Sequence, residues 1–290
     1  MKIKDLRKEF TDALSSQYDS EEILSFFYIL SEKFLGLRRV DIAMALDTII
    51  DNTSFSKFVD AKKRLKEQEP IQYIVGDTVF YGLSFKVNEL VLIPRPETEE
   101  LVDWILRDYQ HKKIERKIKI LDIGTGSGCI AISLAKNLPE ADLFAIDISE
   151  EALEIAKENA KRNNVEVNFI HANVLQLDKL EKDFDIIVSN PPYVRELEKQ
   201  EIKPNVLDHE PHLALFVSDN DPLIFYKKIG KLAKQNLTPR GLLYFEINQY
   251  LGKETKDMIE KLGFESVIVR KDLYDNDRMI KASLIKKNDL

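Results

Sequence analysis

The run Asn190-Pro191-Pro192-Tyr193 has the residue types and the order needed to hold a flat NH2 group. A residue before proline is held in extended conformations and proline fixes its own φ, so the Asn190 side-chain oxygen and the Pro191 carbonyl can lie rigidly side by side. These two acceptors would bind both hydrogens of the NH2 group and direct its lone pair toward an incoming electrophile, while the Tyr193 ring stacks on the flat group. We therefore predict that these four residues are catalytic and contact the substrate. They do not distinguish adenine N6, cytosine N4 and a glutamine amide, because all three present the same NH2.

A glycine-rich turn at residues 121–128, Leu-Asp-Ile-Gly-Thr-Gly-Ser-Gly, predicts a cofactor site. An apolar strand leads into it and a helix follows from Cys129, and glycine lets a backbone approach a ligand closely. A dinucleotide fingerprint needs G-x-G-x-x-G, whereas the pattern here is G-x-G-x-G. Asp122 would repel a pyrophosphate but suits an ammonium group, such as that of S-adenosylmethionine; the alternative is that the glycines only turn the chain. The predicted cofactor-binding residues of this turn are Asp122, Gly124, Thr125, Gly126, Ser127 and Gly128.

Asp147 ends the next predicted strand, where a carboxylate can accept hydrogen bonds from both hydroxyls of a ribose. Dinucleotide enzymes place an acid similarly, so Asp147 indicates an adenosine-like ribose and little more. A role as N-cap of the following helix is the alternative, but Ser149 fits that role better. Asp147 and the adjacent Ile148 are included in the predicted cofactor site.

The charge balance argues against a protein held to nucleic acid by phosphate contacts. The 43 Lys and Arg residues are outnumbered by 50 Asp and Glu, giving a formal charge of −7. Proteins that bind nucleic acid through its phosphates usually carry a basic surplus. We therefore expect no stable nucleic-acid binding.

Cysteine, histidine and hydropathy patterns point to a cytoplasmic protein without a metal site. One cysteine, Cys129, permits no intrachain disulfide, as is common in a reducing compartment. The first residues lack the apolar core of a signal peptide, and no uncharged apolar run reaches the length of about 18 residues that a membrane span needs. The four histidines show no metal-ligand spacing with cysteine or acids.

The first part of the 290-residue chain is predicted to be helical and to form a domain of its own, residues 1–75, that recognises the substrate. Apolar residues spaced three and four apart predict helices over residues 21–35, 40–50 and 56–68. Short β-branched or aromatic runs follow, separated by turn residues, and predict strands at 71–75, 78–80, 83–87 and 90–93. Residues 76–93 are accordingly predicted to be a β-hairpin linker.

Residues 94–290 are predicted to form an α/β domain with a Rossmann-like fold. Strands are expected over 119–123, 142–146, 167–172, 185–189, 241–247, 266–270 and 282–285, and helices over 129–137, 150–163, 222–235 and 252–262, with a further helix opening near Pro94. Repeated βα units imply a mostly parallel sheet covered by helices on both faces. Ligands bind such sheets at the carboxyl ends of the strands.

The residues as a whole resemble the protein-(glutamine-N5) methyltransferases that modify peptide chain release factors, the HemK/PrmC group. The resemblance covers almost the whole chain, and its most specific part is the run Pro94-Arg95-Pro96-Glu97-Thr98-Glu99, which generic DNA or RNA amino-methyltransferases are not expected to carry. The other matching segments are residues 72–76, 80–82, 91–93, 124–128, 190–193, 210–211, 214–215, 246–247 and Gln249.

The resemblance implies a class I methyltransferase fold, S-adenosylmethionine as cofactor, and the glutamine of the release factors' Gly-Gly-Gln loop as substrate. It assigns residues 124–128 and Asp147 to the cofactor, Asn190 to cofactor and substrate, and Pro191 to Tyr193 to the substrate amide. Arg95 and Thr98 are expected to help close the site, with Arg95 contacting the substrate.

Two departures from the family pattern concern the adenine contact and one loop. Asn173 and Val174 stand where the family usually has Asp and often an aromatic residue; both are kept in the predicted cofactor site, since the Asn173 oxygen can still accept from an adenine amino group. Residues 216–221 lack the usual glycines. The alternatives are a glutamine methyltransferase of a ribosomal protein, an N6-adenine or N4-cytosine methyltransferase, and a non-enzymatic module that binds S-adenosylmethionine.

Overall fold

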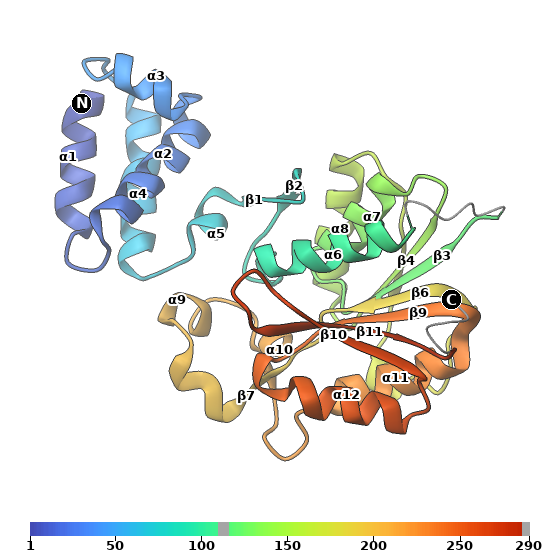
Figure 1. Cartoon of the computed structure of the whole chain (residues 1–290). Coiled ribbons are helices and arrows are strands. Elements are labelled where there is room, and N and C mark those ends of the chain that lie inside the picture. Colours follow the sequence, from blue (N-terminus) through green and yellow to red (C-terminus); the bar gives the residue numbers. More distant parts are fainter. Residues whose placement is uncertain (110–115, 286–290) are drawn as a thin grey trace. The chain divides into compact units, whose positions relative to one another are not determined.

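The computed structural model describes residues 1–109 and 116–285 (Figure 1). The chain divides into two compact units, Met1–Gly76 with Lys203–His209, and Asp77–Ile202 with Glu210–Leu290. No helix of the described residues is long and apolar enough to cross a membrane. His111, one of the four histidines considered above, lies outside the described residues.

The first unit is helical and packs around aromatic side chains. Phe10 meets Phe27 and Phe58 with ring centroids 5.8 and 6.4 Å apart, both edge to face. Asp19 begins the second helix by accepting the amides of the following glutamates, as carboxylate N-caps do. The helices are α1 (Ile3–Leu14), α2 (Ser20–Leu35), α3 (Arg39–Met44), α4 (Asn52–Lys66), α5 (Ile71–Val75) and α9 (Pro204–Leu207).

Two predictions for this unit are wrong. The helix expected over residues 40–50 ends at Met44, because Ile49 forms an antiparallel bridge with Lys2 and the amide of Ile50 donates to the carbonyl of Met1. Residues 71–75, expected to be a strand, are helix α5, which is closed by Gly76 at φ 73°. The five-residue run was too short for its periodicity to separate a buried helical turn from a strand.

The second unit begins with a hairpin of β1 (Asp77–Phe80) and β2 (Leu83–Lys86), joined by a turn with positive φ at Tyr81 and Gly82. The strand expected at residues 90–93 is absent. The amide of Ile93 donates to the buried carboxylate of Glu210 at 3.1 Å, so it is not available to pair with another strand. The segment after β2 is therefore a loop.

A seven-stranded sheet forms the centre of this unit, in the order β10-β11-β9-β6-β3-β4-β5. Five strands from β9 to β5 run parallel and β11 runs antiparallel to both of its neighbours, so the sheet is mostly parallel as predicted. The strands are β3 (Lys119–Ile123), β4 (Asp142–Asp147), β5 (Asn168–His171), β6 (Phe184–Ser189), β9 (Leu237–Glu246), β10 (Ser266–Lys271) and β11 (Asp277–Ser283).

Helices cover both faces of the sheet, as Figure 1 shows. One face carries α6 (Pro96–Tyr109), α7 (Cys129–Asn137) and α8 (Glu150–Arg162), and the other α11 (Ile224–Asn236) and α12 (Gly252–Lys261). Short elements complete the unit: η1 (Val174–Gln176), β7 (Val194–Arg195), η2 (Glu196–Glu201), α10 (His212–Leu215), β8 (Phe216–Val217) and η3 (Gln249–Leu251).

The last strand is misplaced in the prediction, which put it at residues 282–285. It begins at Asp277 because Arg278 pairs with the buried Asp272 at 3.0 Å while Met279 and Ile280 enter the core. A charged residue inside a strand is acceptable when it is paired, and the sequence does not reveal that partner.

Candidate active site

A pocket of about 460 Å³ lies in the second unit, at the carboxyl ends of β3, β4 and β6. This is the edge at which parallel α/β sheets bind their ligands. Most of the sequence-predicted site residues line it: Arg95, Gly124, Thr125, Gly126, Ser127, Asp147, Ile148, Asn173, Val174, Asn190, Pro191 and Pro192. Asp122, Gly128 and Tyr193 are not among its lining residues.

The glycine-rich turn is shaped by three positive φ angles, 75° at Gly124, 54° at Gly126 and 83° at Gly128. A Cβ at Gly124 or Gly126 would meet nothing within 4 Å, so both backbones face open space. A Cβ at Gly128 would lie 2.8 Å from the Ile132 side chain and 3.2 Å from that of Ala156. The first two glycines thus leave room beside the pocket, whereas Gly128 lets α7 and α8 pack closely.

Asp147 accepts backbone hydrogen bonds with both carboxylate oxygens. The amide of Gly126 donates to Oδ2 at 2.8 Å, and the amide of Ser149 donates to Oδ1 at 3.0 Å. Each carboxylate oxygen has a second lone pair, so Asp147 can still accept two hydroxyls from a ligand in the pocket it lines. Ser149 caps α8 through the amide of Ala152, as predicted.

Asp122 is fully buried behind the turn. Thr125 donates to its Oδ2 at 2.6 Å, and Oδ1 has no hydrogen-bond partner among the described residues. Burial raises the pKa of Asp122 to about 7, against the opposing effect of the Thr125 hydroxyl. Asp122 therefore supports the turn through Thr125 and does not contribute to the pocket wall.

Asn190 follows the fully buried strand β6 and is held by a chain of hydrogen bonds. Its Nδ2 donates to Thr98 Oγ1 at 3.2 Å, and Thr98 in turn donates to Glu246 Oε2 at 2.6 Å. Because the hydroxyl hydrogen of Thr98 is bound to a carboxylate, its oxygen must act as the acceptor toward Asn190. This fixes the flip of the Asn190 amide and leaves Oδ1 as an acceptor on a residue that lines the pocket.

Tyr193 belongs to the same chain of hydrogen bonds. Its hydroxyl donates to Glu246 Oε1 at 3.0 Å, and its ring packs against the core on the α11 side of the sheet. Burial raises the pKa of both Tyr193 and Glu246. The structure thus places Tyr193 as a support of the Asn190 loop, outside the pocket wall.

Two buried acids near the pocket, Glu246 and Glu210, had no role predicted from the sequence. Glu246 ends β9, the strand next to β6, and Glu210 accepts hydrogen bonds from Arg95 and the amide of Ile93. The signal for Glu246 was present, since it directly follows four apolar residues of a strand that ends at the ligand edge.

The described residues contain no group of three or more histidines, cysteines and acids that could hold a metal ion. Burial raises the pKa of the Cys129 thiol to about 12, so this pocket residue is a neutral thiol and a poor nucleophile. What the pocket offers is positioned hydrogen-bond acceptors.

Comparisons with known proteins bear on the identity of this pocket. A family model described as the PrmC N-terminal domain matches residues 5–76, and one described as the methyltransferase small domain matches residues 105–212. The release factor glutamine methyltransferase of Flavobacterium psychrophilum is 57% identical over 283 residues, which cover 98% of this chain and 99% of the relative. That of Bacteroides thetaiotaomicron is 46% identical, covering 93% and 96%. The chain belongs to the release factor glutamine methyltransferase family.

Solved structures agree on the fold. A methyltransferase from Pyrococcus furiosus matches 81% of this chain and 99% of its own with a TM-score of 0.53 at 20% identity. A 16S rRNA methyltransferase from T. thermophilus, solved with AdoMet and guanosine, matches 71% and 49% with a TM-score of 0.52 at 17% identity. As a family member with the class I fold, the chain is an S-adenosylmethionine-dependent methyltransferase. The open positions at Gly124 and Gly126 and the carboxylate of Asp147 fit that cofactor.

Proposed function

We propose that this protein transfers a methyl group from S-adenosylmethionine to the side-chain amide N5 of the glutamine in the Gly-Gly-Gln motif of peptide chain release factors. The curated relatives that match nearly the whole chain are named for release factor glutamine methylation. The observation that carries the proposal is the fixed amide of Asn190, whose NH2 is bound to Thr98, so that the oxygen of this pocket residue remains available as an acceptor. An oxygen suits a substrate that is itself an NH2 donor.

The cofactor would occupy the side of the pocket formed by the glycine-rich turn and β4. Gly124 and Gly126 leave room for it, Asp147 accepts the ribose hydroxyls, and Ile148, Asn173 and Val174 surround the adenine. The Asn173 oxygen already accepts the amide of Leu175 at 3.0 Å, which orients it and leaves its second lone pair for a ligand. When bound, the cofactor supplies an electrophilic methyl group.

The acceptor side would be formed by Asn190, Pro191, Pro192 and Arg95. The Asn190 oxygen and the Pro191 carbonyl bind both hydrogens of the glutamine NH2, so its nitrogen lone pair is turned out of conjugation and toward the methyl group. As the N–C bond forms, the bond between the methyl group and the sulfur breaks, and the positive charge passes from the sulfur to the nitrogen. The two acceptors would stabilise this charge before one proton of the nitrogen is lost to solvent. Removing one preorganised hydrogen-bonding group from an oxyanion hole costs on the order of 2.7–4 kcal/mol, and we expect an effect of similar size for these acceptors.

Arg95 would contact the backbone of the substrate loop at the pocket rim. Its guanidinium is held by Glu210, which is only 3% exposed and also accepts the amide of Ile93. Glu210 is followed by the rim residues Pro211, Leu213 and Ala214, so this one carboxylate fixes two segments of the rim. A fixed arginine can bind carbonyl oxygens without losing much side-chain freedom.

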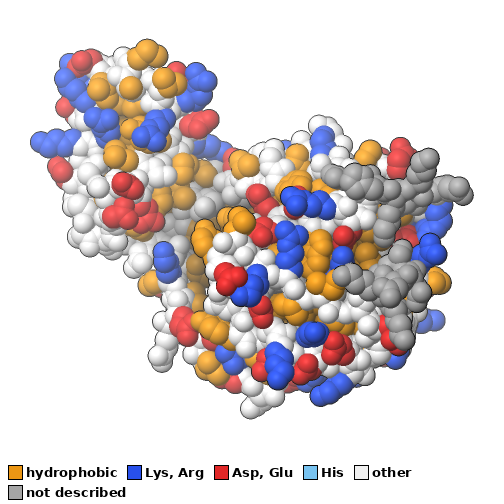
Figure 2. All heavy atoms as spheres, in the orientation of Figure 1, with side chains coloured by type: hydrophobic (Ala, Val, Ile, Leu, Met, Phe, Trp, Pro, Cys, Tyr) orange, Lys and Arg blue, Asp and Glu red, His pale blue; other side chains and the backbone are white. Residues whose placement is uncertain are grey.

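We further propose that residues 1–75 recognise the release factor and that residues 76–93, the β1–β2 hairpin with the loop after it, connect them to the catalytic domain 94–290. We also propose that the protein acts in the cytoplasm, where translation occurs. Figure 2 shows acidic and basic side chains interspersed over the face it presents. Together with the net charge of −7, this favours a protein over a nucleic acid as the partner.

The test is to incubate the protein with labelled S-adenosylmethionine and one acceptor at a time: a release factor, the same factor with the motif glutamine replaced, ribosomal proteins, or DNA and RNA. We expect label in the unmodified release factor alone. Label that persists after the glutamine is replaced would place the methyl group elsewhere. Label confined to a ribosomal protein or to nucleic acid would establish the corresponding alternative and refute the proposal.

A further inference from the structure

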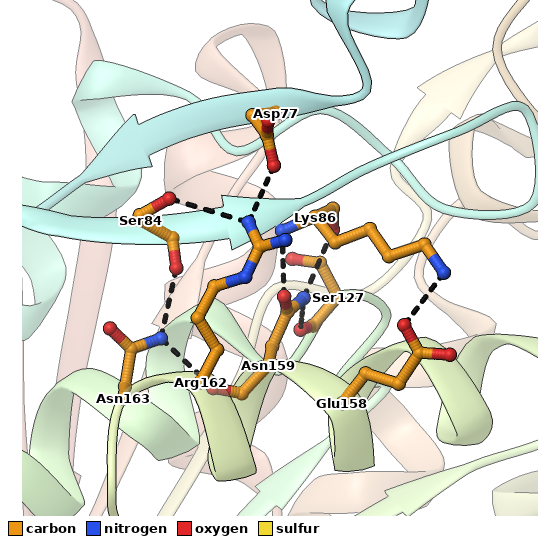
Figure 3. Close-up of polar contacts among 8 residues, drawn as sticks. All are labelled: Asp77, Ser84, Lys86, Ser127, Glu158, Asn159, Arg162 and Asn163. Atoms are coloured by element: carbon orange, nitrogen blue, oxygen red, sulfur yellow. Dashed lines mark hydrogen bonds and ion pairs between the residues drawn. The ribbon is translucent and has the colours of Figure 1, made fainter.

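Asn159 is a fully buried residue of α8 whose side chain connects two segments far apart in sequence. Its Oδ1 accepts the amide of Lys86 at 2.6 Å, and its Nδ2 donates to the Lys86 carbonyl at 3.0 Å and to the Ser127 carbonyl at 2.9 Å (Figure 3). Both N–H hydrogens and the oxygen are therefore used. A buried side-chain amide whose donors and acceptor are all hydrogen-bonded holds its partners in one geometry.

Both segments bound by Asn159 lead to the cofactor pocket. Ser127 lies inside the glycine-rich turn and lines the pocket, and its carbonyl precedes Gly128, where φ is 83°. Lys86 ends β2, and residues 89–92 of the loop that follows line the same pocket. A side chain that fixes the Ser127–Gly128 peptide to the end of β2 thus sets the position of one part of the pocket wall relative to another.

We infer that Asn159 is a positioning residue for the cofactor, and that through it the β1–β2 hairpin holds the glycine-rich turn in its binding geometry. Without Asn159 the Ser127 carbonyl would be buried with no donor, and the peptide it belongs to would reorient. The inference concerns cofactor binding and does not depend on which amide accepts the methyl group.

Asn163 provides a matched control. It is the C-cap of α8, one helical turn after Asn159, and also binds the hairpin. Its Nδ2 donates to the Ser84 carbonyl and to the Asn159 carbonyl, each at 2.9 Å. Among the described residues, its side-chain hydrogen bonds go to the hairpin and to α8, and none goes to the glycine-rich turn (Figure 3). Asn163→Ala therefore loosens the hairpin without releasing Ser127.

The experiment compares Asn159→Ala, Asn159→Asp and Asn163→Ala in the full chain, with S-adenosylhomocysteine as the probe in isothermal titration calorimetry. Asn159→Asp keeps the acceptor for the Lys86 amide and loses both donors. We expect both Asn159 variants to raise the Kd about tenfold, equivalent to ~1.4 kcal/mol. Asn163→Ala should stay within about twofold of the wild type even though its melting temperature falls.

Two further readouts separate positioning from a general loss of stability. The KM for S-adenosylmethionine should rise about tenfold in Asn159→Asp while the KM for the methyl acceptor is unchanged, and amide hydrogen exchange should accelerate at residues 124–130 in Asn159→Asp but not in Asn163→Ala. If Asn159→Ala does not fold, the cofactor affinity and the hydrogen-exchange pattern of Asn159→Asp still test the inference.

Wild-type affinity in Asn159→Asp, or an equal loss in Asn163→Ala, would overturn the inference. Failure of the proposed function would appear as an absence of methyl transfer to release factors. It would leave the calorimetric result unaffected, so the two failures are distinguishable.

Discussion

The two sides of the pocket, which we propose to bind the cofactor and the methyl acceptor, are built in different ways. On the cofactor side, the glycine-rich turn and Asp147 come from consecutive βα units, and backbone amides supply most of their mutual contacts. On the acceptor side, Asn190 is oriented by Thr98 and, through it, by Glu246, which lie 92 and 56 residues away from Asn190 in the sequence. The first side takes its shape mainly from neighbouring βα units, although Asn159 also ties it to the distant β1–β2 hairpin. The second side depends throughout on side chains that only the tertiary structure brings together.

The largest expected effect is on the acceptor side. Asn190→Ala removes the acceptor that we propose orients the substrate amide, and we expect kcat to fall about 10²–10³-fold. The Kd for S-adenosylhomocysteine should change by less than about threefold, because the cofactor side is intact. Steady-state kinetics and calorimetry measure the two quantities separately. Near-normal turnover in this variant would refute the amide-positioning mechanism.

Asp147→Ala should show the opposite pattern. Loss of its carboxylate removes the ribose acceptor and the bond to the Gly126 amide, so we expect cofactor Kd and KM to rise about 10–100-fold, in line with the ~1.5–3 kcal/mol of hydrogen bonds to charged groups. At saturating cofactor, kcat should fall by less than about tenfold. If kcat falls as far as in Asn190→Ala, the two sides of the pocket do not act independently on cofactor binding and on turnover.

Thr98 tests whether Asn190 acts only when it is oriented. Thr98→Val preserves shape but removes the hydroxyl that joins Asn190 to Glu246, and we expect kcat to fall about tenfold with cofactor affinity unchanged. Thr98→Ser retains the hydroxyl and serves as the control, with kcat within about twofold of the wild type. Equal activity in the valine and serine variants would show that the orientation of Asn190 is set elsewhere.

The smallest effect on activity is expected at Asp122, whose contribution is to stability. Its folded-state pKa of about 7 lies above the ordinary value of 3.8, so its contribution favours folding below about pH 4 and is lost as pH rises to about 7. Asp122→Asn removes this dependence. In urea unfolding without cofactor, the variant should gain free energy of unfolding relative to the wild type on going from pH 5 to pH 8. A constant difference between the two proteins would contradict the raised pKa.

The sequence predicts an element well where local contacts shape it and less well where residues distant in sequence do. The strand, turn and helix around residues 119–137 were predicted closely, because apolar runs, positive-φ glycines and helix periodicity are all local signals. Two of the errors fall where a distant partner decides the conformation. Residues 90–93 are a loop because Glu210 takes the amide of Ile93, and the helix after Met44 stops because its backbone pairs with the first residues of the chain.

The sequence by itself determined that this protein has a parallel α/β domain, a glycine-rich turn for an adenosine-bearing cofactor, and an asparagine at the end of a strand that could hold an amide. Each of these depends on the covalent order of neighbouring residues. Only the tertiary structure decided which way that asparagine faces, that Tyr193 supports the loop from behind, and that Asn159 joins the hairpin to the turn. Hydrogen bonds are directional and short-ranged, so they are settled only once the chain has brought both partners within reach.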